Sequence, residues 1–198
     1  MKVHNSSALI GLQTTHKLVL SGKKTILREK HMSDARDDYR WQSDPELAKL
    51  DATEPLNMSF AVYLLDYSIE LKSLRFKRFP LAIDTADGKH IGNITLYDID
   101  EKRSEAQLGI LIGERDYWEK GFGPDAIDTL VDYTFRNTSL ARLYLKTLDW
   151  NTRAQKAFVK SAFVPCGEMK RRPYNFLLME LTRERWEQLK RPGPDSRN

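Results

Sequence analysis

The order of strand-like and helix-like segments predicts a single α/β or α+β domain built around a mixed sheet. Three observations support this class. The 198 residues are enough for one domain with a sizeable core. Segments with the two-residue period of a strand alternate with segments of helical period. Residues 105–148 contain a strand, a glycine-rich turn, an amphipathic helix and a second strand, a unit whose crossover should be right-handed.

The N-terminal third predicts a hairpin followed by helices. Ser21-Gly22 is a turn dipeptide between two apolar runs, and Asp44-Pro45 is a helix start. The expected elements are strands at 17–20 and 23–28, a helix from Ser33 or Asp34 to about Gln42, a short helix from Asp44-Pro45, and a helix at 59–76. In this last helix Val62, Leu65, Ile69 and Leu74 lie roughly on one side.

The remaining chain predicts most of the sheet. Asp87-Gly88 is a hairpin signal between two strands, and residues 105–112 alternate cleanly, with Ala106, Leu108, Ile110 and Ile112 on one face. The expected elements are strands at 79–84, 90–97, 105–112, 142–148, 164–171 and 174–181, a helix that follows Gly121-Phe122-Gly123 and runs to about 136, and a helix at 151–162. We therefore expect an N-terminal extension at 1–16, one domain at 17–189, and a flexible tail at 190–198.

Composition excludes several classes of function. The net charge is only +4, and the basic residues do not interleave with aromatic residues as in a nucleic-acid platform. One cysteine, Cys166, and four scattered histidines offer no zinc-like spacing. No apolar run approaches the roughly 20 residues of a membrane span. We expect a cytoplasmic protein without metal, nucleic-acid partner or membrane anchor.

The charge distribution is uneven. Residues 33–54 carry seven acidic and three basic side chains. Such a region can attract a cationic substrate, or it can simply form the solvated face of a helix. The sequence leaves both interpretations open.

The segment 108–126 carries the clearest chemical signal. A strand leads into Gly121-Phe122-Gly123 and then into a helix, so backbone N–H groups at the helix start can face a phosphate. Arg115 and Lys120 add positive charge, and Pro124 suits the first helical position. A plain strand–helix turn remains the alternative for this motif taken alone.

The surrounding motifs resemble those of GNAT acetyltransferases. Residues 117–126, Tyr-Trp-Glu-Lys-Gly-Phe-Gly-Pro-Asp-Ala, resemble that superfamily's pyrophosphate loop, Gln/Arg-x-x-Gly-x-Gly/Ala, with Trp118 at the Gln/Arg position. Residues 151–154, Asn-Thr-Arg-Ala, followed by Ala162-Phe163, resemble its second motif. The likeness extends over about residues 17–181 and is greatest to the branch that contains ribosomal-protein N-terminal and spermidine acetyltransferases.

This resemblance implies a fold and a donor. The fold is a mixed, mostly antiparallel sheet of about six to seven strands, flanked by helices, with a splayed parallel strand pair. The donor is acetyl-CoA, and similar proteins are often homodimers. The residues implied in cofactor binding are Ile110, Leu111 and Ile112 along the pantetheine arm, Trp118, Glu119, Lys120, Gly121, Phe122 and Gly123 around the pyrophosphate, and Asn151.

The implied reaction is direct acetyl transfer, in a ternary complex, to a primary amine of a protein N-terminus, a polyamine or another small cationic amine. The amine must lose a proton, so a general base is needed. The family's usual acid, a tyrosine, is Phe158 here, and the position of a frequent central-strand acid is Gln107. Glu105 and Glu54 are therefore the candidate catalytic residues, with Asp98 as a further one. The alternative is a weak or inactive acyl-CoA-binding or partner-binding protein of the same fold.

Overall fold

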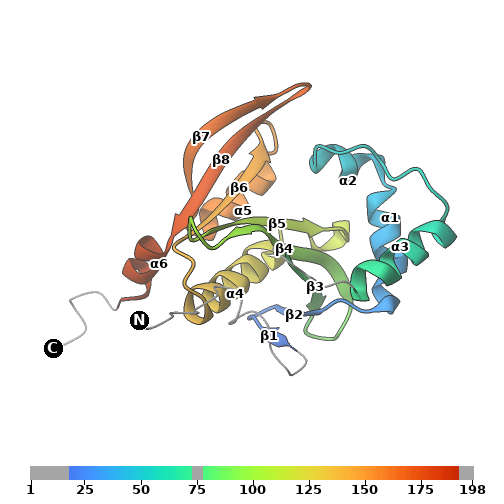
Figure 1. The fold of residues 1–198 in the computed structure, drawn as a ribbon, viewed down its shortest axis with the longest axis horizontal. Coiled ribbons are helices and arrows are strands. Elements are labelled where there is room, and N and C mark those ends of the chain that lie inside the picture. Colours follow the sequence, from blue (N-terminus) through green and yellow to red (C-terminus); the bar gives the residue numbers. More distant parts are fainter. Residues whose placement is uncertain (1–17, 73–77, 192–198) are drawn as a thin grey trace, which may run out of the picture.

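The computed structural model describes residues 18–72 and 78–191, and shows one mixed α/β domain (Figure 1). Its sheet has the strand order β1-β2-β3-β4-β5-β6-β8-β7. The strands are β1 Val19–Ser21, β2 Thr25–Glu29, β3 Phe79–Thr85, β4 His90–Asp100, β5 Glu105–Ile112, β6 Arg142–Leu148, β7 Val164–Arg171 and β8 Tyr174–Thr182. Neighbours are antiparallel except β5 and β6. The expected class is confirmed, with eight strands instead of six to seven.

The helices cover the two faces of this sheet unequally. They are α1 Ala35–Gln42, α2 Pro45–Leu50, α3 Phe60–Lys72, α4 Phe122–Asn137, α5 Thr152–Lys160 and α6 Arg183–Lys190, with 3-10 turns at Met32–Asp34 and Arg115–Tyr117. The main core lies between the sheet and α4, where the predicted stripe from Ala126 to Phe135 packs on Ala106 and Leu108. A smaller cluster around Tyr63 and Tyr67 joins α3 to α1.

The parallel strand pair separates along its length. Glu105, Ala106 and Gln107 of β5 pair with Arg142, Leu143 and Tyr144 of β6, and no pairing follows. Beyond this point β5 stays paired to β4 as far as Ile112, whereas β6 stays paired to β8 as far as Leu148. The β6-facing edge of β5 is therefore unpaired from Leu108 onward, which is the expected splay.

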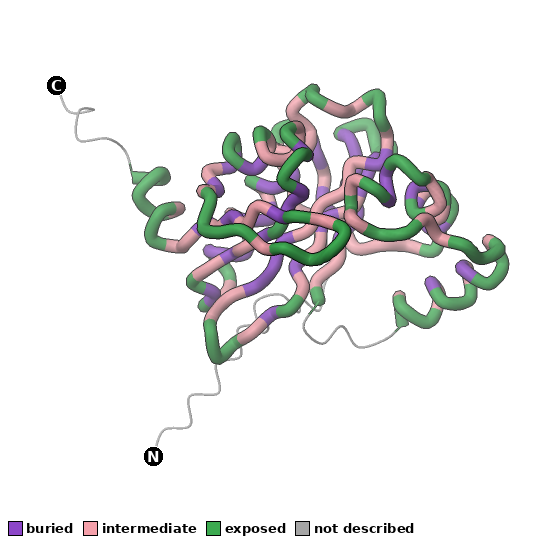
Figure 2. The backbone as a smooth tube through the Cα atoms, turned by 90° about the horizontal axis from the view of Figure 1, so that it is seen from above, coloured by how far each residue is buried: buried purple, intermediate pink, exposed green. Residues whose placement is uncertain are grey.

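The aliphatic side of α3 is not its buried side. Val62, Leu65 and Ile69 are 49%, 67% and 66% exposed, and the buried residues of this helix are Tyr63 and Tyr67. Figure 2 shows α3 at the edge of the molecule, mostly exposed. The helix packs through its tyrosine rings on α1, and periodicity of the aliphatic residues could not reveal that preference. Leu74 lies outside the described residues.

Three boundaries also differ from the predictions. The β1–β2 turn follows Ser21, because Gly22 N donates to Thr25 O. Pro124 is the third residue of α4 and not the first. An N–H at the third helical position would also lack an intrahelical acceptor, so a proline fits there. Lys190, assigned to the tail, ends α6, where its ammonium pairs with Asp132 at 2.8 Å. Residues 1–17 and 192–198 lie outside the described residues.

Candidate functional site

A cavity of about 230 Å³ lies at the splay; we name it the splay cavity. Its walls come from the end of β5, the turn before α4, the N-terminal half of α4, α2 and α5. Eight of the expected cofactor residues line it: Ile110, Leu111, Ile112, Trp118, Glu119, Gly121, Gly123 and Asn151. The other two do not. Lys120 O accepts a hydrogen bond from Lys24 Nζ at 2.7 Å, and the Phe122 ring packs on Tyr117.

The turn before α4 leaves backbone donors without an intrahelical acceptor beside this cavity. Gly121, the residue before the helix, has a φ of 86°, which glycine adopts without strain. The first hydrogen bond of the helix runs from Asp125 N to Gly121 O at 3.2 Å, so the amides of Phe122 and Gly123 have no intrahelical acceptor. A Cβ at Gly123 would meet nothing closer than Ile112 Cγ1 at 4.0 Å. This space and these donors fit a phosphate group.

Asp125 anchors the start of α4 to the first hairpin. Its carboxylate accepts hydrogen bonds of 2.9 Å from the backbone N of Lys23, Lys24 and Thr25. Burial alone would raise the pKa of Asp125, but these hydrogen bonds lower it below its usual value. A Cβ on Gly22 would lie 2.4 Å from Asp125 Oδ2, so this turn accommodates only glycine. The hairpin therefore positions the phosphate-facing turn, which local sequence did not indicate.

Trp118 fills the family position usually taken by Gln or Arg. Its Nε1 donates to Ile112 O at 2.7 Å, and the Arg153 guanidinium lies 3.3 Å from the centre of its ring. Burial of Arg153 lowers its pKa from the ordinary value. Trp118 thus caps the end of β5 and fixes a cation of α5 beside the splay cavity.

The residues that supply positive charge at the splay cavity differ from those predicted. Arg115 is engaged by Asp44 at 2.9 Å and by Glu46 at 2.7 Å, so its charge is compensated. The cations that line the splay cavity are Arg153, Lys156 and Lys160 of α5. Their spacing of three and four residues places them on one helix face, a signal that was present in the sequence.

Three further cavities lie on the other side of the splay. The helical cavity, about 560 Å³, lies between α1–α3 and β4, and the hairpin cavity, about 570 Å³, lies between the loop after α2 and the β7–β8 hairpin. The strand cavity, about 450 Å³, lies over β4 and β5 and includes Asp98. Phe158 lines both the splay and the hairpin cavity. The splay cavity and the hairpin cavity therefore adjoin at this phenylalanine.

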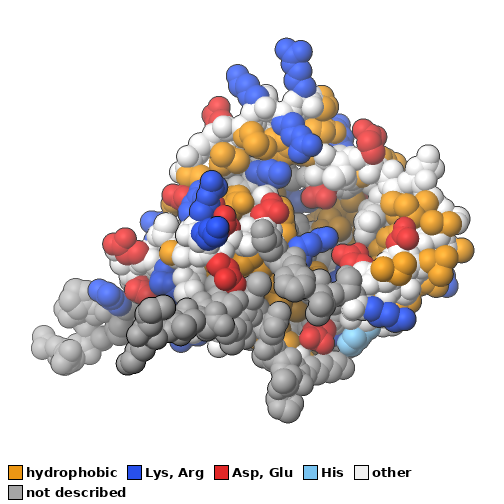
Figure 3. All heavy atoms as spheres, in the orientation of Figure 1, with side chains coloured by type: hydrophobic (Ala, Val, Ile, Leu, Met, Phe, Trp, Pro, Cys, Tyr) orange, Lys and Arg blue, Asp and Glu red, His pale blue; other side chains and the backbone are white. Residues whose placement is uncertain are grey.

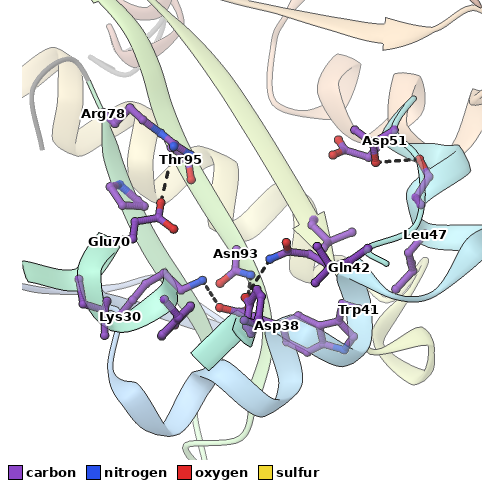
Figure 4. Close-up of a pocket in the computed structure, with 18 of the residues that line it drawn as sticks. Lys30, Asp38, Trp41, Gln42, Leu47, Asp51, Glu70, Arg78, Asn93 and Thr95 are labelled. Atoms are coloured by element: carbon purple, nitrogen blue, oxygen red, sulfur yellow. Dashed lines mark hydrogen bonds and ion pairs between the residues drawn. The ribbon is translucent and has the colours of Figure 1, made fainter. Parts of the chain in front are cut away.

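Asp51 lines all four cavities. It follows α2, and Figure 4 shows its carboxylate above Leu47, across the helical cavity from Asp38. Asp51 is an exposed residue at the mouth of these cavities, yet the protein around it desolvates the carboxyl and raises its pKa, with Lys146 acting in the opposite direction. Glu54 lines the helical and hairpin cavities. Neither carboxylate forms an ion pair with a described residue. Glu54 is a named candidate from the sequence, whereas Asp51 counts there only among the acidic residues of 33–54.

Glu105 lies elsewhere. Its Oε2 pairs with Arg142 Nη1 at 2.6 Å, in the part of β5 that is still paired to β6. It lines none of the four cavities. Gln107, on the same strand, donates from Nε2 to Tyr97 Oη at 2.6 Å. This geometry favours a structural ion pair for Glu105.

A buried cluster of six charges lies beneath the helical cavity: Arg28, Lys30, Asp34, Asp38, Asp84 and His90. Arg28 reaches Asp34 at 2.8 Å and Asp84 at 2.6 Å. Asp38 contacts Lys30 and accepts from Asn93 Nδ2 at 2.6 Å, as Figure 4 shows. Burial opposes its ionisation, yet these contacts and His90 lower its pKa to about 2. Part of the acidic region 33–54 is therefore ion-paired core.

His90 completes this cluster as a cation. Its ring nitrogens lie 3.3 Å from Asp84 and 3.5 Å from Asp38, and Asp34, Arg28 and Lys30 complete the charged surroundings. Burial by itself lowers the pKa of His90, but the facing carboxylates raise it to about 9. Because this folded-state value lies above the ordinary 6.5, the resulting stability is fully present below pH 6.5 and is lost as pH rises through 9.

We therefore expect the free energy of unfolding to fall by on the order of 3 kcal/mol between pH 6.5 and 9.5. His90→Gln should lower stability at pH 6 and remove most of this dependence, as measured by urea unfolding across that pH range. An unchanged slope in the variant would contradict a protonated His90.

Within residues 18–72 and 78–191, no helix is long and apolar enough to cross a membrane. The same residues contain no group of three or more His, Cys, Asp or Glu side chains arranged to hold a metal ion. The single cysteine, Cys166, is exposed.

Comparisons with known proteins agree with this geometry. Residues 24–164 match the family model described as an acetyltransferase (GNAT) domain. The uncharacterized N-acetyltransferase p20 of Bacillus licheniformis is 29% identical over 146 residues, which are 71% of this chain and 79% of that protein. Spermidine N-acetyltransferase of Vibrio cholerae, solved with CoA and spermine, has a TM-score of 0.72 at 20% identity and covers 82% of this chain and 98% of its own. RimJ of Mycobacterium smegmatis, in complex with CoA-disulfide, has a TM-score of 0.71 at 20% identity, and the match covers 88% of this chain and 90% of RimJ.

The two structural likenesses are of fold, whereas the family model matches well over half of the chain. Together with the splayed strands and the phosphate-facing turn, this match shows that the chain belongs to the GNAT superfamily of N-acetyltransferases.

Proposed function

We propose that the chain transfers the acetyl group of acetyl-CoA to a primary amine, by direct transfer in a ternary complex. The proposal rests chiefly on Asp51, an unpaired carboxylate of raised pKa at the point where the splay cavity meets three cavities on the acceptor side. Donor and acceptor can then approach from opposite sides of the unpaired edge of β5.

The donor side matches a nucleotide thioester. The free amides at the start of α4 face the diphosphate, and the α5 cations add charge for phosphate oxygens. The unpaired edge of β5 over Leu108–Ile112 binds the amide-bearing arm, as strand pairing does in a sheet. Asn151 caps α5 through a 3.2 Å bond to Ala154 N and lines the same cavity.

The acceptor side supplies the proton chemistry. Asp51 accepts the proton of the incoming ammonium, directly or through water, and Glu54 adds a second negative charge that favours a cationic acceptor. A backbone N–H in the segment Ile110–Ile112 stabilises the developing thioester oxyanion. Phe158 has no proton to give, but a thiol with a pKa of about 8.5 leaves readily as an anion. The proposed reaction therefore proceeds without the usual tyrosine.

The acceptor is a protein N-terminus, a polyamine or another small amine. The V. cholerae spermidine N-acetyltransferase was solved with spermine, and the M. smegmatis relative is RimJ. Cytoplasmic location and a homodimer are parts of the same proposal. The strand β7 forms one outer edge of the sheet, which a second copy can extend.

A second candidate function is acyl-CoA binding without turnover. Two residues favour it. Phe158 stands where the family usually has an acidic tyrosine, and Gln107 stands where the central strand frequently has a carboxylate. Calorimetry with acetyl-CoA, together with free-thiol release over a panel of primary amines, separates the two. Binding with thiol release on at least one amine supports the transferase. Binding without release on any amine supports the second candidate.

The α5 cations give a direct test of the donor site. Lys156→Glu should weaken CoA affinity about fivefold, because it replaces attraction to a phosphate by repulsion. The measurement is calorimetry at low salt, with the exposed Lys102→Glu as the matched control. Equal affinity in both variants would place the phosphates away from α5.

A further inference from the structure

The hairpin cavity has walls of opposite charge. Asp51 and Glu54, on the segment after α2, line one side, and Arg171 and Arg172 of the β7–β8 hairpin line the other. Lys146 of β6 also lines the cavity and acts on the Asp51 carboxylate. Figure 1 shows the hairpin rising opposite α2, and Figure 3 shows Lys and Arg side chains gathered over it. This separation is independent of the donor site, because none of these three cations lines the splay cavity.

None of the three cations forms an ion pair with another described residue. Arg171 and Arg172 form no ion pair or side-chain hydrogen bond with a described residue. The Lys146 ammonium lies 6.0 Å from the centre of the Phe176 ring. Its charge favours the ionised form of Asp51 and so opposes the effect of burial on the pKa of that carboxyl. A carboxylate or phosphate bound at this end of the cavity would be attracted by the positive charge of these side chains.

Aromatic side chains lie in the same cavity. Tyr97, Tyr174 and Phe176 line it, and the last two form an edge-to-face pair at 6.4 Å. The volume of about 570 Å³ is large enough for an acceptor that contacts both charged walls. Extended polycations are poorly suited to it, because their distal charges would face the arginines.

We propose that the acceptor is two-ended: its primary amine binds at Asp51 and Glu54, and a carboxylate or phosphate several bonds away binds at Lys146, Arg171 and Arg172. This inference rests on the proposed function and narrows its substrate class to amines that carry a remote anion. The shared chemistry can come from a small amino acid or from an acidic peptide N-terminus.

The first experiment varies only the remote charge. Free-thiol release from acetyl-CoA is measured with 6-aminohexanoate against 6-aminohexanamide, and with the dipeptide amides Ala-Glu, Ala-Gln and Ala-Lys. The anionic member of each set should have about tenfold higher kcat/KM than the neutral one, and Ala-Lys amide the lowest. The two sets distinguish a small-molecule acceptor from a peptide acceptor. Equal values in both sets, or a preference for Ala-Lys amide, would overturn the inference.

The second experiment locates the anion. The double variant Arg171→Glu/Arg172→Glu should abolish the preference for anionic acceptors and leave CoA affinity unchanged. Lys170→Glu, on the same hairpin but lining a different cavity with Asp149 and Gln155, should keep the preference. A preference that survives the double variant would place the anion elsewhere and reject the site.

A failure of the proposed acetyl transfer can be told apart from a failure of the two-ended acceptor site. If CoA binds but no amine releases thiol, acetyl transfer is what fails. Calorimetry of 6-aminohexanoate with the CoA-loaded protein then decides the inference. Binding that the double variant abolishes and 6-aminohexanamide does not reproduce supports the two-ended site, and any other binding result rejects it.

Discussion

Replacing Asp51 by asparagine should lower kcat/KM for the acceptor amine by about 10²–10⁴-fold, with little change in acetyl-CoA affinity. The substitution preserves shape and removes the one carboxylate, among the described residues, that lines both the splay cavity and the three other cavities. It is the largest functional effect that we expect from a single substitution. Steady-state thiol release and calorimetry on the same preparation measure the two quantities.

The pH profile adds a second readout. Desolvation raises the pKa of Asp51, so the acidic limb of kcat/KM should lie above the ordinary Asp value of 3.8. Activity rises as this carboxyl ionises, and in Asp51→Asn that limb should disappear while the residual rate stays low. Glu54→Gln should chiefly raise KM, because Glu54 lines two acceptor cavities but not the splay cavity.

Glu105→Gln is the matched control for a carboxylate outside the cavities. Its ion pair with Arg142 is structural in our interpretation, so kcat/KM should stay within a few-fold. A large loss of activity in Glu105→Gln, with Asp51→Asn unaffected, would return the base to the position on β5 that the sequence favoured.

Replacing Arg28 by methionine should destabilise the fold by about 3–5 kcal/mol. Arg28 is only 15% exposed and holds two carboxylates, Asp34 and Asp84, that are 3% and 10% exposed. Removing the guanidinium leaves both charges buried with fewer partners. Urea unfolding at pH 7 measures the change, and Arg40→Met is the control. Arg40 is 56% exposed in its pairs with Asp37 and Glu114, so its loss should cost at most about 1 kcal/mol.

At acidic pH the free energies of unfolding of the wild type and of Arg28→Met should become more similar. Burial opposes ionisation of Asp34 and Asp84, but their contacts with Arg28 and His90 lower both pKa values in the folded state. Depressed carboxyl pKa values contribute stability above about pH 4 that is lost as pH falls. The wild type should lose this stability below pH 4 more steeply than the variant. Parallel curves would show that Arg28 does not stabilise the two ionised carboxylates.

Local signals predicted the elements and the donor side. Asp44 caps α2 through the amides of Glu46 and Leu47, and Asn151 caps α5, as their spacing indicated. The strand, glycine turn and helix between Glu105 and Asn137 occur where periodicity placed them. These features depend on hydrogen bonds and side-chain periods within a few residues, so the sequence by itself determined the fold class. Eight of the ten residues that the family resemblance implied in cofactor binding line the splay cavity.

Only the tertiary structure decided which charged groups are free to act. Arg115 appeared available for phosphate and is paired to α2, and Glu105 appeared available as a base and is paired to β6. His90 and Asp38 meet although 52 residues separate them. Asp51 became the leading candidate because four cavities converge on it. Pairing, burial and the resulting pKa values depend on which distant segments pack together, and local periodicity contains no record of that choice.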